Sequence, residues 1–199
     1  MASDLVSQPT PNRRWLGVLF FLFWIVALGV AYWYFLVRPQ QWFDPQMRQP
    51  PLLSQLPSQV QLRTLLKKQF PKLNDENHWF IRFRQADCGC ERFVELYHKS
   101  FEQTAPPNTQ VRTVDMANNG FSEQEKALLR QWVPATPSVA VFYGGGDVLY
   151  FGPYHQDGIC NAENSYLEPV MESIVHGEPI TVFNTLVYGC FCHTDQVAR

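Results

Sequence analysis

The hydrophobic pattern begins with one long apolar run near the N-terminus. Residues 15–37 read WLGVLFFLFWIVALGVAYWYFLV, which is 23 residues without a charged side chain. As a helix, with about 1.5 Å per residue, this run extends about 34 Å, enough to cross the hydrocarbon core of a bilayer. Trp15 and the aromatic residues 32–34 lie near its ends, where amphipathic rings prefer the membrane interface. We therefore predict a single membrane-spanning helix.

Beyond residue 58, short apolar stretches alternate between helical and strand periodicity. HWFIRFR at 78–84 alternates apolar and polar residues, as a strand does, whereas residues 91–101 repeat their apolar positions with the period of a helix. The expected elements are helices at 58–70, 91–101, from 122, and at 166–175, strands at 78–84, 109–114, 138–143 and 148–151, and a terminal strand or ordered tail at 180–187. This order predicts an α/β fold with a mixed sheet flanked by helices.

The segment between the apolar run and the first expected helix is rich in proline. Such a composition is typical of a stiff, extended linker. The predicted organisation is a cytoplasmic tail at 1–14, the transmembrane helix at 15–37, a linker at 38–57, and a globular domain at 58–199 with a cysteine-containing C-terminal extension.

Charge indicates the compartment and excludes one class of partner. The 199-residue chain has 17% charged residues and a net charge of −2, without a basic cluster, so no nucleic acid is expected to bind. Arg13 and Arg14 precede the apolar run and favour a cytoplasmic N-terminus. An uncleaved anchor then places the globular domain outside the cytoplasm. In a Gram-negative bacterium this is a protein of the inner membrane with a periplasmic domain, where disulfides persist.

Two cysteines separated by one residue lie where the expected strand 78–84 gives way to a helix. A helix N-terminus stabilises an anion, so Cys88 and Cys90 are candidates for reactive thiolates, the nucleophiles of thiol–disulfide exchange. Residues i and i+2 of a helix point about 200° apart, so these two cysteines pair only if Cys88 stays outside the helix. Gly89 assists, because glycine reaches backbone angles closed to other residues.

These motifs resemble the thioredoxin-like superfamily over residues 78–175. HWFIRFRQAD runs into Cys88-Gly89-Cys90, VPATPSVAVF places Thr136-Pro137 where that family has its cis-proline, and VAVFYGGGDVLYFG is a hairpin before a final helix. The resemblance implies a thioredoxin-like fold and a thiol–disulfide oxidoreductase. Cys88 attacks, Cys90 resolves the mixed disulfide, and Thr136 and Pro137 bind an extended segment of a protein thiol or disulfide partner. No cofactor is expected.

The sequence departs from the family pattern at three places. The motif is Cys-Gly-Cys rather than Cys-x-x-Cys, Arg82 stands where a buried acidic residue is common, and Asp87 replaces an aromatic residue before the first cysteine. A carboxylate beside Cys88 opposes thiolate formation. Cys88 is nevertheless expected to be the more exposed and more reactive of the pair.

Three further cysteines, Cys160, Cys190 and Cys192, lie outside the motif. They predict a second redox pair or a structural bridge that holds the C-terminal tail, and a bond from Cys160 to one of the other two is one of the open pairings. A third reading makes Cys88, Cys90, Cys190 and Cys192, together with His193, ligands of zinc or cuprous ion. The alternatives to an enzyme are thus a metal-binding protein or chaperone and a non-catalytic, disulfide-stabilised scaffold. His98 is expected on the solvated face of its helix.

Overall fold

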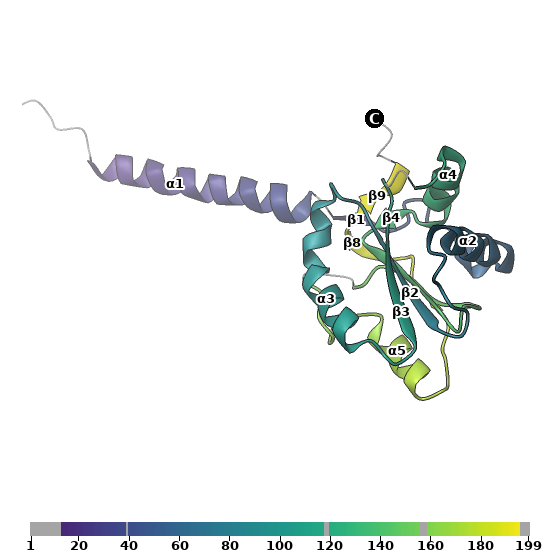
Figure 1. The fold of residues 1–199 in the computed structure, drawn as a ribbon. Helices are drawn as coiled ribbons and strands as arrows, with labels where there is room; N and C mark the ends of the chain where they lie inside the picture. The colour runs from purple at the N-terminus through teal and green to yellow at the C-terminus, as the bar shows by residue number, and fades with distance from the viewer. Residues whose placement is uncertain (1–12, 39, 118–119, 156–158, 196–199) are drawn as a thin grey trace, which may run out of the picture. The chain divides into compact units, whose positions relative to one another are not determined.

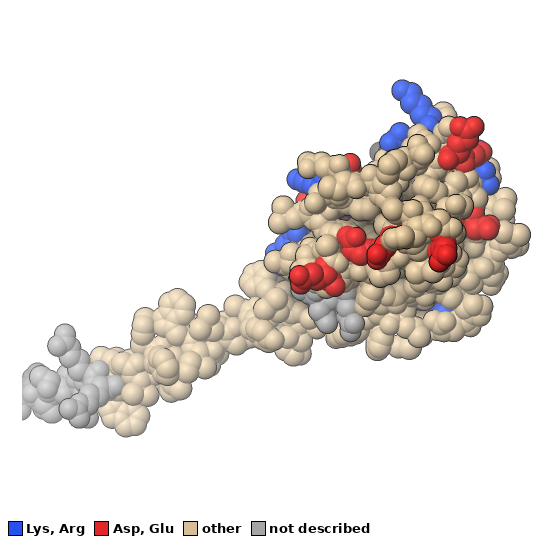
Figure 2. Space-filling view, turned by 90° about the horizontal axis from the view of Figure 1, so that it is seen from below, with Lys and Arg blue, Asp and Glu red and all other residues tan. Residues whose placement is uncertain are grey.

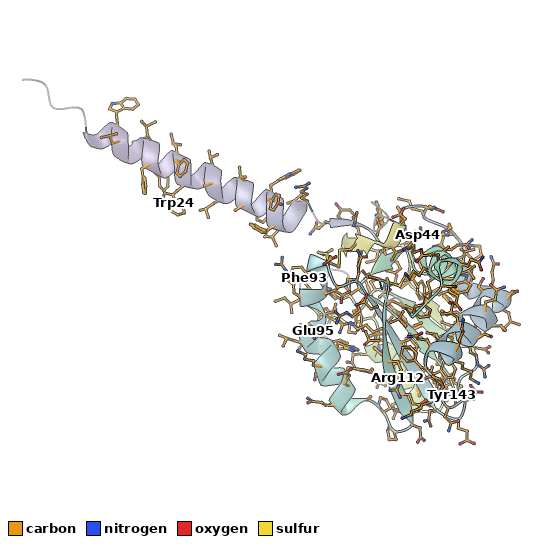
Figure 3. All side chains as sticks on the ribbon, turned by 45° about the horizontal axis from the view of Figure 1, so that its top comes forward. Trp24, Asp44, Phe93, Glu95, Arg112 and Tyr143 are labelled. Carbon is orange, nitrogen blue, oxygen red and sulfur yellow. A yellow bond between two sulfur atoms is a disulfide. The ribbon has the colours of Figure 1, made fainter. Side chains whose placement is uncertain are left out.

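The computed structural model describes residues 13–38, 40–117, 120–155 and 159–195. The chain divides into two compact units, Met1–Arg38 and Pro39–Arg199. In the first unit, α1 (Arg13–Tyr32) continues into one π-helical turn, η1 (Trp33–Val37). The stretch Trp15–Val37 is long and apolar enough to cross a membrane. It shows no charged side chain in Figure 2, and its Trp24 projects outward in Figure 3.

A five-stranded mixed sheet forms the centre of the second unit (Figure 1). The strand order is β3-β2-β5-β6-β7. The pairs β2·β3 and β6·β7 are parallel, whereas β2·β5 and β5·β6 are antiparallel. The strands are β2 (His78–Arg84), β3 (Thr109–Asp115), β5 (Ser138–Phe142), β6 (Val148–Gly152) and β7 (Val182–Phe183). The α/β prediction with a mixed sheet is confirmed.

Helices cover both faces of this sheet, and β2 shows why. Trp79, Ile81 and Phe83 belong to one hydrophobic cluster and Phe80 to another, because successive side chains of a strand point to opposite faces. The first cluster includes buried residues of α2 (Leu56–Gln69) and α4 (Glu123–Trp132), and the second those of α3 (Glu95–Thr104) and α5 (Glu168–Val175). Figure 1 shows the resulting three layers.

The proline-rich segment is packed, which corrects the prediction that residues 38–57 form an unpacked linker. It contains β1 (Gln40–Trp42) and a short 3-10 helix, η2 (Leu52–Ser54). Phe43 and Leu53 are fully buried in the cluster that includes α2. Proline restricts the backbone but does not prevent the apolar residues between prolines from being buried. The proline-rich composition therefore did not indicate that this segment is packed.

Two element boundaries also differ from the prediction. The helix expected at 91–101 is divided at Val94 into a 3-10 helix, η3 (Gly89–Phe93), and α3. The segment 180–187 contributes the short strand β7. The chain then continues to β8 (Tyr188–Cys190) and β9 (Cys192–His193), which join small two-stranded sheets instead of the central one.

Candidate functional site

Cys88 and Cys90 lie in the segment that leads from β2 into η3. Cys88 precedes η3 and has an extended backbone (φ −80°, ψ 109°), so it lies outside the helix. This is the condition that the one-residue spacing sets for a bond between Cys88 and Cys90. Both cysteines are buried, with 4% and 3% of their surface exposed. The two exposed fractions are nearly equal, so the expected difference in exposure between Cys88 and Cys90 is absent. The C-terminal chain segment covers both.

Each cysteine of the motif is bonded to a cysteine near the C-terminus. The disulfides join Cys88 to Cys192 and Cys90 to Cys190, with Cα atoms 5.8 and 5.5 Å apart. Residues i and i+2 of an extended chain face the same side, so Cys190 and Cys192 meet both members of the Cys-Gly-Cys motif. Cys88 and Cys90 are therefore not bonded to each other here.

Cys160 takes no part in these disulfides, so the bond to Cys190 or Cys192 that the sequence left open does not form. It remains a thiol, and burial raises its pKa to about 12. Its backbone N–H donates to the Phe93 carbonyl at 2.9 Å. A buried thiol of raised pKa carries little thiolate at neutral pH and is a poor nucleophile. Cys160 thus serves packing.

The Thr136–Pro137 peptide bond is cis, as predicted. The Thr136 carbonyl oxygen lies 3.7 Å from Cys88 Sγ, so the proline loop adjoins the first cysteine of the motif. While Cys88 is bonded to Cys192, this is a packing contact. In a reduced chain the Cys88 thiol is able to donate a hydrogen bond to the Thr136 carbonyl oxygen. The hydroxyls of Thr136 and Ser138 are buried and have no hydrogen-bond partner among the described residues.

The C-terminal strap, residues 188–194, passes over the cysteines and this loop. Its strand β9 pairs antiparallel with β4 (Ala135–Thr136), with Thr136 opposite Cys192, and β8 pairs antiparallel with β1. Phe191, between the two strap cysteines, points into the core and meets Phe43 edge-on at 5.3 Å. The matched spacing of the two Cys-x-Cys motifs is the sequence signal that could have identified the pairing.

Arg82 supplies a buried cation beside the motif. Its Nη2 donates to Glu91 Oε2 at 2.7 Å and to Glu95 Oε2 at 2.9 Å, and only 3% of the residue is exposed. Burial raises the pKa of Glu91, and Arg82 opposes that shift. The hydrogen bond from Arg82 lowers the pKa of the more exposed Glu95, labelled in Figure 3. Arg82 was expected only as a departure from the family pattern, and Glu91 and Glu95 were not predicted as its partners, although their spacing of four residues is a helix-face signal.

His98 is buried, not solvated as predicted. It packs beside Phe80, and its Nδ1 lies 3.2 Å from the Tyr154 hydroxyl. Burial lowers its pKa to about 4, with a further contribution from the charge of Arg82. The ion pair with Glu102 at 3.3 Å needs a protonated ring, and burial disfavours that form. His98 is therefore a neutral group of the core at neutral pH.

The sulfur atoms of Cys88, Cys90 and Cys192 lie within 4.8 Å of one another. His193 does not face them, because its Nε2 bonds to the Trp42 carbonyl at 2.8 Å. The five-residue metal site considered from the sequence thus reduces to three sulfurs, which are free to bind an ion only after the disulfides are reduced. Thiolates at such separations suit cuprous ion or zinc.

Comparison with known proteins gives one match. No curated protein and no solved structure matches the chain. A family model described as a domain of unknown function, DUF6436, matches residues 58–194, which include the central sheet, both cysteine motifs and the strap. The chain therefore belongs to the DUF6436 family.

Proposed function

We propose that this protein is a membrane-anchored thiol–disulfide oxidoreductase acting on protein thiols or disulfides through Cys88 and Cys90. The observation that carries the proposal is the close group of Cys88, Cys90 and Cys192, whose sulfurs lie within 4.8 Å of one another. Exchange requires a thiolate to approach a disulfide sulfur, so these atoms need little movement to exchange partners. The adjacent cis-proline loop supports the same reading.

The proposed fold family is thioredoxin-like. In its support, β2, α3 and β3 form a parallel β-α-β unit, and the cysteine motif lies between β2 and α3. The antiparallel pair β5·β6 and the helix α5 follow, and the cis-proline precedes β5. Folds host unrelated functions, so the proposed activity rests on the sulfur geometry rather than on this arrangement.

The proposed location is the inner membrane, with the globular unit in the periplasm. Arg13 and Arg14 at the N-terminal end of the apolar helix favour a cytoplasmic N-terminus. Two disulfides suit an oxidising compartment. A reporter enzyme that works only after export, fused to the C-terminus, is expected to be active. Activity of a reporter that works only in the cytoplasm would contradict this orientation.

In the proposed reaction, Cys88 exchanges first and Cys90 second. In the reduced chain, the Cys88 thiolate attacks a partner disulfide, forms a mixed disulfide and releases one partner sulfur as a thiolate. Cys90 then attacks Cys88, which releases the second partner sulfur and forms a Cys88–Cys90 disulfide. Two electrons pass from the chain to the partner, each attacking thiol loses a proton, and each released thiolate gains one. The extended backbone of Cys88 is compatible with this bond.

Metal binding is the second candidate, favoured by the same three sulfurs. In a reduced chain Cys88, Cys90 and Cys192 would hold cuprous ion or zinc without the reaction above. A disulfide-stabilised scaffold is the remaining alternative, because both disulfides join the sheet's cysteine motif to the chain's C-terminal part.

The test is thiol titration of the purified chain, with mass mapping of its disulfides and assays of disulfide reduction and metal binding. We expect turnover of a protein disulfide, its loss in Cys88→Ser, and accumulation of mixed disulfides at Cys88 when Cys90→Ser is combined with Cys190→Ser and Cys192→Ser, because Cys192 is also able to resolve them. Cys160→Ser is the matched control and is expected to keep turnover, because Cys160 lies outside the sulfur group. Tight stoichiometric metal without turnover would favour the metal-binding protein. A chain that shows neither turnover nor metal binding would favour the scaffold.

A further inference from the structure

The strap lies where the proposed function requires a partner. Its strand β9 pairs antiparallel with β4, with His193 opposite Ala135 and Cys192 opposite Thr136. Cys192 is bonded to Cys88, whose sulfur lies 3.7 Å from the Thr136 carbonyl. An extended segment with one cysteine is thus already paired with the proline loop and joined to the first cysteine of the motif.

Side chains on either side of Cys192 give this segment a defined seat. Phe191 is 4% exposed and meets Phe43 edge-on. Its carbonyl accepts a hydrogen bond from Gln41 Nε2. Thr194, two residues after Cys192, donates its hydroxyl to the Val133 carbonyl at 2.7 Å. The seat therefore accepts an aromatic residue, a cysteine, and a hydroxyl two residues later.

The disulfides contribute much of what holds the strap. The ladder between β9 and β4 has two residue pairs, and that between β8 and β1 has three. Isolated pairings this short are marginal in water. A strap held in this way is secured while the disulfides are intact and becomes mobile when they are reduced.

We infer that the strap is a tethered occupant of the partner site, and that reduction of its two disulfides opens the site to an extended polypeptide carrying an aromatic-Cys-x-Thr or aromatic-Cys-x-Ser sequence. The inference rests on the proposed function, because that function places a partner strand on Thr136. It adds a substrate class and a condition for access. In the oxidised chain the strap closes the partner site, and in the reduced chain this site is open to the partner polypeptide.

Opening consumes an external dithiol. One thiolate of the dithiol attacks Cys192 Sγ, the bond to Cys88 breaks, and Cys88 leaves as a thiolate. The second thiolate of the dithiol attacks the mixed disulfide, so Cys192 leaves and the dithiol becomes a disulfide. Two electrons enter the chain, and the two protons lost by the dithiol are taken up by the released thiolates. The same sequence at Cys190 releases Cys90.

The first experiment measures hydrogen exchange of the full chain, oxidised and reduced. The Thr194 amide, which donates to the Pro134 carbonyl at 3.0 Å, and the β9 amides are expected to exchange at least about 10-fold faster after reduction, while β2 and β5 stay protected. Unchanged exchange in the strap, or strap amides that stay as protected as those of β2 and β5 after reduction, would overturn the inference. Neither result depends on turnover, so this arm is separate from the test of the proposed function.

Two threonine variants provide a matched pair for the same measurement. Thr194→Val removes the hydroxyl that bonds to Val133 and keeps the side-chain shape. Thr185→Val removes a buried hydroxyl that has no hydrogen-bond partner among the described residues. In the reduced chain, Thr194→Val is expected to speed strap exchange by roughly 3- to 10-fold and Thr185→Val to leave it unchanged. Equal effects of the two variants would contradict a strap seated by Thr194.

The second experiment tests the partner class by trapping. The full chain with Cys90→Ser, Cys190→Ser and Cys192→Ser keeps Cys88 but neither resolves a mixed disulfide nor re-forms the strap bonds. The probe is the peptide Tyr-Gly-Ser-Phe-Cys-His-Thr-Asp, disulfide-bonded to a small thiol, which leaves when Cys88 attacks. Trapping is expected to be at least about 10-fold faster than for the peptide with Ala in place of Phe, because the aromatic ring is buried on binding.

Three results separate the possible failures. Faster trapping when Thr194→Val is added to that chain, and not when Thr185→Val is added, supports a strap that competes with the partner. Equal trapping of the Phe and Ala peptides would overturn the inference and leave the proposed function standing. A chain that traps neither peptide nor a small-molecule disulfide, although its strap opens on reduction, would overturn the proposed function and with it the partner site.

Discussion

At the scale of single residues, the most unusual feature is the buried charge of Arg82. It occupies β2 on the face that otherwise carries Phe80, and it is balanced by Glu91 and Glu95. Taking an ion out of water is costly unless a partner compensates it. The network therefore ties the first turns after the cysteine motif to the sheet.

Arg82→Met is expected to destabilise the domain by about 3–5 kcal/mol, because Glu91 is left buried without its partner. Chemical denaturation of the oxidised chain measures this change. Arg84→Met is the control, since the Arg84–Asp115 pair at 3.6 Å is partly exposed and is worth at most about 1 kcal/mol. Similar losses in both variants would show that the network has no special role.

The lowered pKa of His98 makes the free energy of unfolding depend on pH. Its folded-state pKa of about 4 lies below the ordinary value of 6.5, so the unfolded chain binds more protons between those values. Stability is thus full above pH 6.5 and falls as the pH drops toward 4, by about 3 kcal/mol across the window.

His98→Gln is expected to flatten that acid-side loss, whereas His176→Gln, at an exposed position, is expected to retain it. Thermal or denaturant unfolding at a series of pH values provides the measurement. A wild-type slope that persists in His98→Gln would assign the pH dependence to other groups.

At the scale of elements, local signals were sufficient where a helix or turn satisfies its own hydrogen bonds. Ser122 caps α4 and Glu125 completes the capping box, at the position from which the sequence predicts a helix. In contrast, the helix expected at 91–101 is interrupted at Val94, whose N–H bonds three residues back to Glu91. Short 3-10 segments are frequent at helix N-termini, and apolar periodicity alone does not distinguish them from the first turn of an α-helix.

Ser122→Ala is expected to cost about 1 kcal/mol, because the Glu125 N–H at the start of α4 loses the Ser122 hydroxyl that accepts its hydrogen bond. Ser100→Ala, at an exposed position within α3, is expected to be neutral or slightly stabilising, since alanine favours helix. Denaturation midpoints of the two variants are compared. A neutral Ser122→Ala would mean that packing alone sets where α4 begins.

At the scale of the whole molecule, the two disulfides are nested around nearly the same long loop. They join residues separated by 104 and 100 positions. Once either bond exists, the other closes only a loop of a few residues. Their contributions to stability therefore cannot be additive under the chain-entropy account of disulfides.

Removing one disulfide, by Cys88→Ala with Cys192→Ala or by Cys90→Ala with Cys190→Ala, is expected to cost about 2 kcal/mol. Removing both is expected to cost about 7 kcal/mol, well above the sum of the two single losses. Equilibrium unfolding of the three variants measures this, with Cys160→Ser as the cysteine control. Additive losses would contradict the nested arrangement.

The sequence by itself determined the apolar helix, the order of most helices and strands and the start of α4, and the family resemblance implied the cis-proline at Thr136-Pro137. These features depend on local periodicity, on caps and on a short motif, which are written in neighbouring residues. These elements support the proposed thioredoxin-like fold.

Only the tertiary structure decided which cysteines meet, that residues 38–57 are packed, and that His98 and Arg82 are buried with their partners. These outcomes depend on contacts between residues far apart in the chain, such as Cys88 with Cys192 and Phe43 with Phe191. Four paired cysteines allow three connectivities, and composition cannot choose among them. The strap's pairing with β4 places Cys192 opposite Thr136, whose carbonyl oxygen lies 3.7 Å from Cys88 Sγ, and this brings Cys192 to Cys88.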